Sequence, residues 1–180
     1  MSRLTHAVAE GDGISVLVEV ADGEEAAGAE QQGADALAVR RPVDLDESSQ
    51  LPLLFVGGVD GARRASADAV VIAVDADSWE EAREAGLDCV VRVADADELE
   101  RALEELDPEV FLLSPEPGSE DVLEALLGLL HDVPAGKLAI AELRTASADD
   151  VAELERAGVD AVLVTASDVV ALVSTELPEF

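Results

Sequence analysis

Two glutamates and an arginine each stand at the end of a short apolar run, where side chains from different segments can gather in one site. Glu19 follows "ISVLV", Arg92 follows "DCVV" and Glu142 follows "KLAIA". A carboxylate confined beside a guanidinium group can act as a general base. It can equally form a structural ion pair, because a buried charge needs a partner. Both interpretations stay open, and the residues alone favour the ion pair.

Arginines follow several of the same runs. Six of the ten arginines are expected at one end of the fold, four at the ends of apolar runs and two in a loop. Guanidinium groups bind phosphate in a bidentate manner, so this gathering predicts an anion site for a phosphorylated small molecule. The alternative, that Arg40, Arg41 and Arg144 pair with surface carboxylates, has equal weight. The six are Arg40, Arg41, Arg63, Arg64, Arg92 and Arg144.

The elements that must position these residues are eight apolar runs with amphipathic stretches between several of them. Each run carries Val, Ile, Leu and Ala at both odd and even positions, which is typical of a parallel strand covered on both faces. Eight such strands predict one compact (β/α)₈ TIM barrel over residues 1–180, with its active site at the carboxyl ends of the strands. A flavodoxin-like open sheet needs about five strands and leaves three runs unexplained. The runs are 14–20, 34–40, 51–56, 67–74, 88–94, 109–114, 137–142 and 160–165.

The chain is short for such a barrel, whose usual length is about 250 residues. Only "RPVDLDESSQ" separates the second and third strands, and only "GGVDGARRAS" separates the third and fourth. Neither segment can hold a full amphipathic helix, so the helices after strands two and three are predicted to be shortened or missing. The outward side chains of "LPLLFV" are then expected to be partly bare, and a homodimer across this flank would bury them. The alternative is that these loops fold back as irregular cover.

The composition of the chain restricts the classes of molecule that it can bind. The chain has 41 acidic and 11 basic residues and a formal net charge of −30, which repels nucleic acid and anionic lipid. No apolar run is long enough to span a bilayer and the start lacks a signal-peptide pattern, so we expect a cytoplasmic protein with no membrane partner. No metal-ligand spacing, dinucleotide loop or nucleophile elbow is present, so no metal and no cofactor is predicted. The single cysteine, Cys89, reads as a small buried hydrophobe.

The order of these motifs resembles the indole-3-glycerol-phosphate synthase family. "VLVEVADG", "GADALAVRR" and "LPLLFVGG" are similar to its first three strands, and the similarity is strongest from "REAGLDCVVRVADADELERAL" to "VPAGKLAIAELRTASADDVAELERAGVDAVLVTAS". The resemblance implies a (β/α)₈ barrel. It also implies a phosphorylated carboxyphenylamino-deoxyribulose substrate and decarboxylating ring closure in tryptophan biosynthesis.

The family's functional positions are partly kept. Its first-strand and seventh-strand glutamates match Glu19 and Glu142, whereas its fifth-strand glutamate is Arg92. The lysine after the first strand is Ala21, and the third-strand lysine that serves as general acid is Val56. We therefore assign catalytic positions to Glu19, Glu142 and Arg92. Substrate or phosphate binding is assigned to Arg40, Arg144, Ser114, Thr165 and Ser167.

Three functions follow as hypotheses. The first is a divergent synthase in which other groups replace the lysines. The second is another enzyme or binder of a phosphorylated small metabolite, and the third is a non-catalytic barrel that acts through association. Ring closure needs an acid to protonate the departing hydroxyl, and both lysines are absent, so the residues favour a preserved scaffold with an altered or lost reaction.

Overall fold

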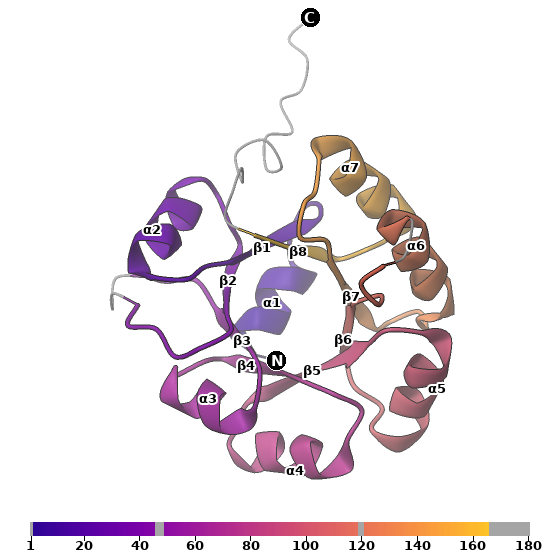
Figure 1. Cartoon of the computed structure of the whole chain (residues 1–180), viewed down its shortest axis with the longest axis horizontal. Helices are drawn as coiled ribbons and strands as arrows, with labels where there is room; N and C mark the ends of the chain where they lie inside the picture. Colours follow the sequence, from indigo (N-terminus) through magenta and orange to yellow (C-terminus); the bar gives the residue numbers. More distant parts are fainter. Residues whose placement is uncertain (1, 46–48, 119–120, 166–180) are drawn as a thin grey trace, which may run out of the picture.

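Eight parallel strands form a closed barrel. A computed structural model describes residues 2–45, 49–118 and 121–165. The strands pair in chain order, and β1 also pairs with β8, which closes the sheet (Figure 1). The predicted (β/α)₈ barrel is confirmed, and each predicted strand contains an observed one. The strands are β1 (Ser15–Glu19), β2 (Ala36–Val39), β3 (Leu53–Val56), β4 (Ala69–Ile72), β5 (Asp88–Val93), β6 (Val110–Leu113), β7 (Leu138–Glu142) and β8 (Ala161–Thr165).

All the helices of the described residues except α1 ring the barrel on its outside (Figure 1). Between β2 and β3 the described residues form no helix, and α3, after β3, has only six residues. The predicted shortening at these two places is confirmed. Among the described residues, no helix is long and apolar enough to cross a membrane. The helices are α1 (Arg3–Ala9), α2 (Gly23–Gln31), α3 (Val59–Arg64), α4 (Ala76–Glu84), α5 (Ala96–Glu105), α6 (Val122–Asp132) and α7 (Ala148–Ala157).

Side chains alternate between the inside of the barrel and the outer layer, because successive residues of a strand point to opposite faces. Two separate buried clusters result. The outer cluster packs strands against helices, and the inner one fills the barrel with aliphatic side chains. Its strand members are Leu17, Ala36, Ala38, Leu54, Ala69, Val71, Val90, Val110, Leu112, Ile140, Ala161 and Leu163.

The amino end of the barrel is closed by α1, which lies behind the strands in Figure 1. Leu4 and Val8 are buried and belong to the inner cluster. The Thr5 hydroxyl donates to Oδ2 of Asp88 at 2.9 Å, which ties the helix to the start of β5. The functional opening is therefore left at the carboxyl ends of the strands.

The flank formed by β3 differs from the prediction. Leu53 and Phe55 point outward but are only 7% and 3% exposed, because the loop before β3 folds back over them and α3 packs beside it. A Cβ atom added to Gly57 would lie 2.8 Å from the Phe55 ring, and one added to Gly61 would lie closer still. These glycines let a short helix cover a large ring. The expected bare flank is therefore wrong, and the homodimer stays a prediction without the observation that motivated it.

Candidate functional site

The mouth of the barrel is the opening at the carboxyl ends of its strands. Its polar residues occupy the last inward-pointing positions of these strands. Glu19 is two residues after Leu17 on β1, and Glu142 is two residues after Ile140 on β7, so each points into the barrel above the inner apolar cluster. The same alternation brings most of the predicted site residues to one opening. The inward positions at the carboxyl ends are Glu19, Arg40, Val56, Ala73, Arg92, Ser114, Glu142 and Thr165.

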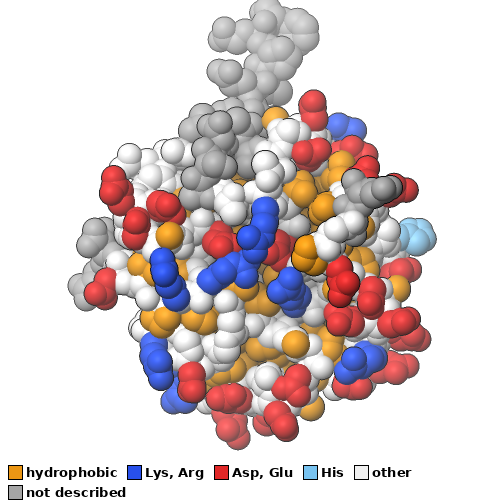
Figure 2. Space-filling model, in the orientation of Figure 1, with side chains coloured by type: hydrophobic (Ala, Val, Ile, Leu, Met, Phe, Trp, Pro, Cys, Tyr) orange, Lys and Arg blue, Asp and Glu red, His pale blue; other side chains and the backbone are white. Residues whose placement is uncertain are grey.

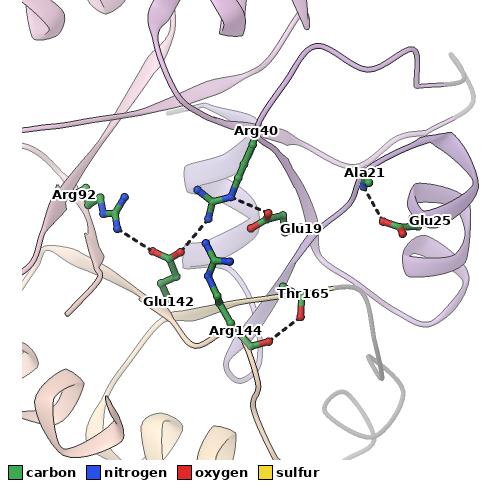
Figure 3. A network of polar contacts seen from close by, with 8 residues as sticks. All are labelled: Glu19, Ala21, Glu25, Arg40, Arg92, Glu142, Arg144 and Thr165. Atoms are coloured by element: carbon green, nitrogen blue, oxygen red, sulfur yellow. Dashed lines mark hydrogen bonds and ion pairs between the residues drawn. The ribbon is translucent and has the colours of Figure 1, made fainter. Parts of the chain in front are cut away.

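Arg40 bridges the two glutamates (Figure 3). Its Nε donates to Oε1 of Glu19 at 2.8 Å, and its Nη2 donates to Oε1 of Glu142 at 3.1 Å. The hydrogen bond with Glu19, with help from the charges of both carboxylates, raises the pKa of the Arg40 guanidinium above its ordinary value. The Arg40 guanidinium, which follows β2, thereby links this strand to both β1 and β7. Arg40 was assigned to substrate or phosphate binding, and here its guanidinium contacts the two glutamates assigned to catalysis.

Arg92 lies on the other side of Glu142. Its Nη2 donates to Oγ of Ser114 at 2.9 Å and is 4.0 Å from Oε2 of Glu142. Ser114 is buried, whereas the Arg92 side chain is 45% exposed. A guanidinium group has five N–H donors, so Arg92 can bind a ligand and keep its contact with Ser114.

One oxygen of Glu142 has no hydrogen-bond donor within the described part of the chain. The side chain is only 9% exposed. Among the described residues, Oε2 is buried without a hydrogen bond and has only the 4.0 Å contact with Arg92, while Oε1 accepts a hydrogen bond from Arg40. A buried acceptor without a donor costs about 1–3 kcal/mol, which a ligand that supplies a donor would recover. A donor brought to this oxygen would offset that cost.

A cavity of about 590 Å³ opens beside Glu142, at the carboxyl ends of β5, β6 and β7. This volume is within the usual range for small-molecule sites, about 300–1,000 Å³. Its charged lining balances two guanidinium groups against two carboxylates, in a chain whose net charge is −30. The polar lining residues are Arg92, Ser114, Glu116, Glu142, Arg144 and Thr145.

The remaining assigned residues lie around β8. The Arg144 side chain points into the mouth (Figure 3). The Thr165 hydroxyl donates to the carbonyl oxygen of Arg144 at 2.8 Å, so it fixes the loop after β7. Ser167, assigned to substrate or phosphate binding, lies outside the described residues.

The expectation of six basic groups at one end is wrong for two of them. Arg63 and Arg64 form the last turn of α3, which runs from the mouth toward the opposite end of the barrel. There Arg64 lines a different cavity with Arg3 and Asp68. Figure 2 shows basic side chains at the centre of the mouth face and many acidic ones toward its rim.

Sequence reasoning missed two polar residues of the cavity, Glu116 and Thr145. Both follow assigned positions in the loops after β6 and β7. Their place just after Ser114 and Arg144 was the available signal, but loop residues have no alternation that says where a side chain points.

The positions that match the family's lysines carry no acid. Val56 is half-buried and packs against the inner apolar cluster. The backbone N–H of Ala21 donates to Oε2 of Glu25 at 2.7 Å, so this residue, just before α2, is tied to the first turn of the helix. The single lysine of the chain, Lys137, precedes β7 at the amino end of the barrel, with Nζ 2.7 Å from Oδ1 of Asp107.

Known structures share this fold at low sequence identity. The N-acetylmannosamine-6-phosphate 2-epimerase from Clostridium perfringens is 14% identical, with a TM-score of 0.67 over 85% of this chain and 86% of that one. Thiamine phosphate pyrophosphorylase from Pyrococcus furiosus is 17% identical, with a TM-score of 0.66 over 93% of this chain and 90% of that one. A mutant tryptophan synthase alpha-subunit from Pyrococcus furiosus is 13% identical, with a TM-score of 0.65 over 87% of this chain and 88% of that one. No family model and no curated protein matches the sequence. These likenesses establish the barrel fold.

Proposed function

We propose that the mouth of the barrel binds a small phosphorylated metabolite. The observation that carries this proposal is the cavity of about 590 Å³ into which Arg92 and Arg144 bring guanidinium groups. Guanidinium groups match the geometry of phosphate oxygens and stay charged at any physiological pH. The names of the three similar structures support a phosphorylated ligand, since two of them name a phosphate ester.

The electrostatics of the cavity support an anionic ligand. Most of the surface carries excess negative charge, which repels a phosphate, whereas the cavity lining is balanced. Arg40 neutralises Glu19 and one oxygen of Glu142, so the carboxylates of the mouth do not present their full charge to a ligand. Arg40 therefore reduces the repulsion that a phosphate would meet as it approaches Arg92 and Arg144.

Thermal unfolding with added ligands tests the proposal. We expect ribulose 5-phosphate, glucose 6-phosphate or glycerol 3-phosphate to raise the melting temperature, because a ligand that binds only the folded state stabilises it. The matching compounds without phosphate should give no rise. Arg92→Met should abolish the response, whereas Arg101→Met, which removes an exposed arginine of α5, should keep it. Absence of a response to all three phosphates, or an equal response in Arg92→Met, would overturn the proposal.

The synthase is the specific case implied by the resemblance. Its favourable observation is that Glu19 and Glu142 converge on Arg40, at the positions of the family's two matching glutamates. The reaction also needs an acid where this chain has Ala21 and Val56. We therefore expect the carboxyphenylamino-deoxyribulose phosphate to bind without forming indole-3-glycerol phosphate. Fluorescence of the indole product would show turnover, and a signal lost in the Glu19→Gln, Glu142→Gln double variant would contradict this expectation.

A further inference from the structure

Only carboxylates are placed to move protons at the mouth. The chain has no tyrosine, and all of its lysine, histidine and cysteine residues lie in the described part, away from the mouth. Lys137 pairs with Asp107 at the amino end. His6 is on α1, and His131 is in the last turn of α6. Cys89 is the second residue of β5, and burial raises the pKa of its thiol to about 11.

Glu142 is the carboxylate best placed for this role. Glu19 is 21% exposed and is held by Nε of Arg40, whereas Glu142 lines the cavity and its buried Oε2 accepts no hydrogen bond from a described residue. Its other oxygen is fixed by Arg40, so the group is oriented and one lone-pair face is free. A base must be within hydrogen-bond reach of the proton that it takes, and Glu142 lines the cavity in which a ligand would lie.

Arg92 supplies the complementary group. Its Nη2 is 4.0 Å from Oε2 of Glu142, too far for a hydrogen bond between them. Two neighbouring atoms of a ligand can therefore contact the two groups at once, a carbonyl oxygen at the guanidinium and the adjacent C–H group at the carboxylate. A fixed cation beside a developing oxyanion is an effective way to lower the barrier of such a step.

We infer that Glu142 takes a proton from the carbon next to a carbonyl group of the bound phosphorylated molecule, while Arg92 holds the carbonyl oxygen. The C–H bond breaks and its electron pair forms the C=C bond of an enolate. The former C=O pair moves to the oxygen that faces Arg92, and the proton goes to Oε2 of Glu142. The step reverses when the carboxylic acid returns a proton to carbon. This inference rests on the proposed binding function and adds a reaction class to it.

Proton exchange in deuterated water tests the inference with ribulose 5-phosphate as the probe. We expect the full chain to replace hydrogen by deuterium at the carbons next to the ketone, seen as loss of their ¹H NMR signals above the protein-free rate. Glu142→Gln should lower the exchange rate about 100-fold or more, because the amide is no base. Glu142→Asp should retain part of the activity. Glu153→Gln, on the exposed face of α7, is the matched control and should leave the rate unchanged.

Binding of the same probe separates the two proposals. Thermal unfolding of Glu142→Gln with ribulose 5-phosphate should still show stabilisation and also reports whether the variant is folded. Binding by the natural chain without exchange would overturn the inference and leave the binding function intact. Exchange by Glu142→Gln at the natural rate would also overturn it. If ribulose 5-phosphate does not bind, the inference is overturned for ketose phosphates, and the responses to the other two phosphates decide the binding function separately.

Discussion

Arg40 joins two carboxylates that the closed sheet brings to one point from β1 and β7. Without its guanidinium, Glu19 and the nearly buried Glu142 would share the mouth with only Arg92 and Arg144 as nearby cations among the described residues. A charge left without its partner in a partly buried site is costly, so the bridge should matter to folding.

Arg40→Met should therefore destabilise the protein. A buried pair that loses one member costs about 3–5 kcal/mol, but Arg40 is one-third exposed and water screens part of the interaction, so we expect about 1–2 kcal/mol. Urea unfolding at pH 7 measures the change in the free energy of unfolding.

A matched exposed arginine provides the control for this experiment. Arg101→Met removes an exposed contact with Glu105 on α5 and should cost at most about 0.5 kcal/mol. Adding Glu142→Gln to Arg40→Met should recover part of the lost stability. Equal stability of Arg40→Met and Arg101→Met would contradict this account of the bridge.

The Cys89 thiol should react slowly with alkylating reagents. Burial raises its pKa to about 11, so very little of it is thiolate at pH 8. Labelling with iodoacetamide should be much slower in the folded protein than in urea and should accelerate between pH 9 and 11. A folded-state rate at pH 8 equal to that in urea would contradict the assignment.

The gathering of Glu19, Arg92 and Glu142 could be predicted from sequence. Each ends an apolar run, and the ends of parallel barrel strands meet at one opening. The bridge by Arg40 could not be predicted, because a long side chain has many rotamers and its partners depend on the distances between strands. The burial of one Glu142 oxygen likewise depends on packing that no local pattern encodes.

At the level of elements, the packing of α3 against the Phe55 ring depends on Gly61, a glycine within the helix. Gly61 lies against the Phe55 ring, and a methyl group there would collide with it. Gly61→Ala should therefore destabilise the protein by about 1–3 kcal/mol, although alanine usually favours helices. Gly28→Ala in α2, where nothing lies within 4 Å of the added atom, should stabilise it by about 0.5–1 kcal/mol. Thermal unfolding of both variants measures the contrast, and changes of the same sign would contradict it.

Three aspartates serve as connectors between strands. Asp35, Asp68 and Asp160 each precede a strand and accept the backbone N–H of a residue on or near the start of a neighbouring one, each at 2.8 Å. They reduce the number of unsatisfied backbone groups at the amino end of the barrel.

Asp160 offers a pH-dependent test. Burial raises the pKa of its carboxyl, so the stability that depends on its protonation is greatest below the unfolded pKa and is lost as pH rises through the folded value. Asp160→Ala should cost about 1–3 kcal/mol at pH 7, because the Ala139 N–H loses its acceptor. Asp160→Asn keeps an acceptor oxygen and should cost less. In urea unfolding, the free energy of unfolding of the natural protein should increase relative to that of Asp160→Asn as pH falls from 7 toward 4. The opposite trend would contradict the assignment.

The strands could be predicted because each has apolar residues at both odd and even positions and is long enough to recognise. The cover over β3 could be predicted only as one of two alternatives, since it uses irregular backbone in which Val43, Leu45 and Leu51 pack without a period. The role of α1 was missed for a related reason. Seven residues with two buried apolar side chains are too short a pattern to indicate a helix that closes a barrel.

At the level of the whole molecule, the net charge of −30 opposes compactness. Salt shortens the Debye length from about 10 Å at 0.1 M to about 3 Å at 1 M, which screens repulsion between exposed carboxylates. The melting temperature should therefore rise by several degrees between 0.1 and 1 M KCl. A decrease over this range would contradict the view that surface repulsion outweighs the surface ion pairs.

The most direct test of the central claim is to locate a phosphorylated ligand on the barrel. Titration of the ¹⁵N-labelled protein with ribulose 5-phosphate, followed by ¹H–¹⁵N correlation spectra, reports which backbone amides change. We predict shifts at the amides of the cavity lining and none at the amino end near α1; the expected residues are Arg92, Ser114, Glu116, Glu142, Leu143, Arg144 and Thr145. Shifts confined to other parts of the barrel, or no shifts with any of the three phosphates, would contradict the claim that this mouth is a phosphate-binding site.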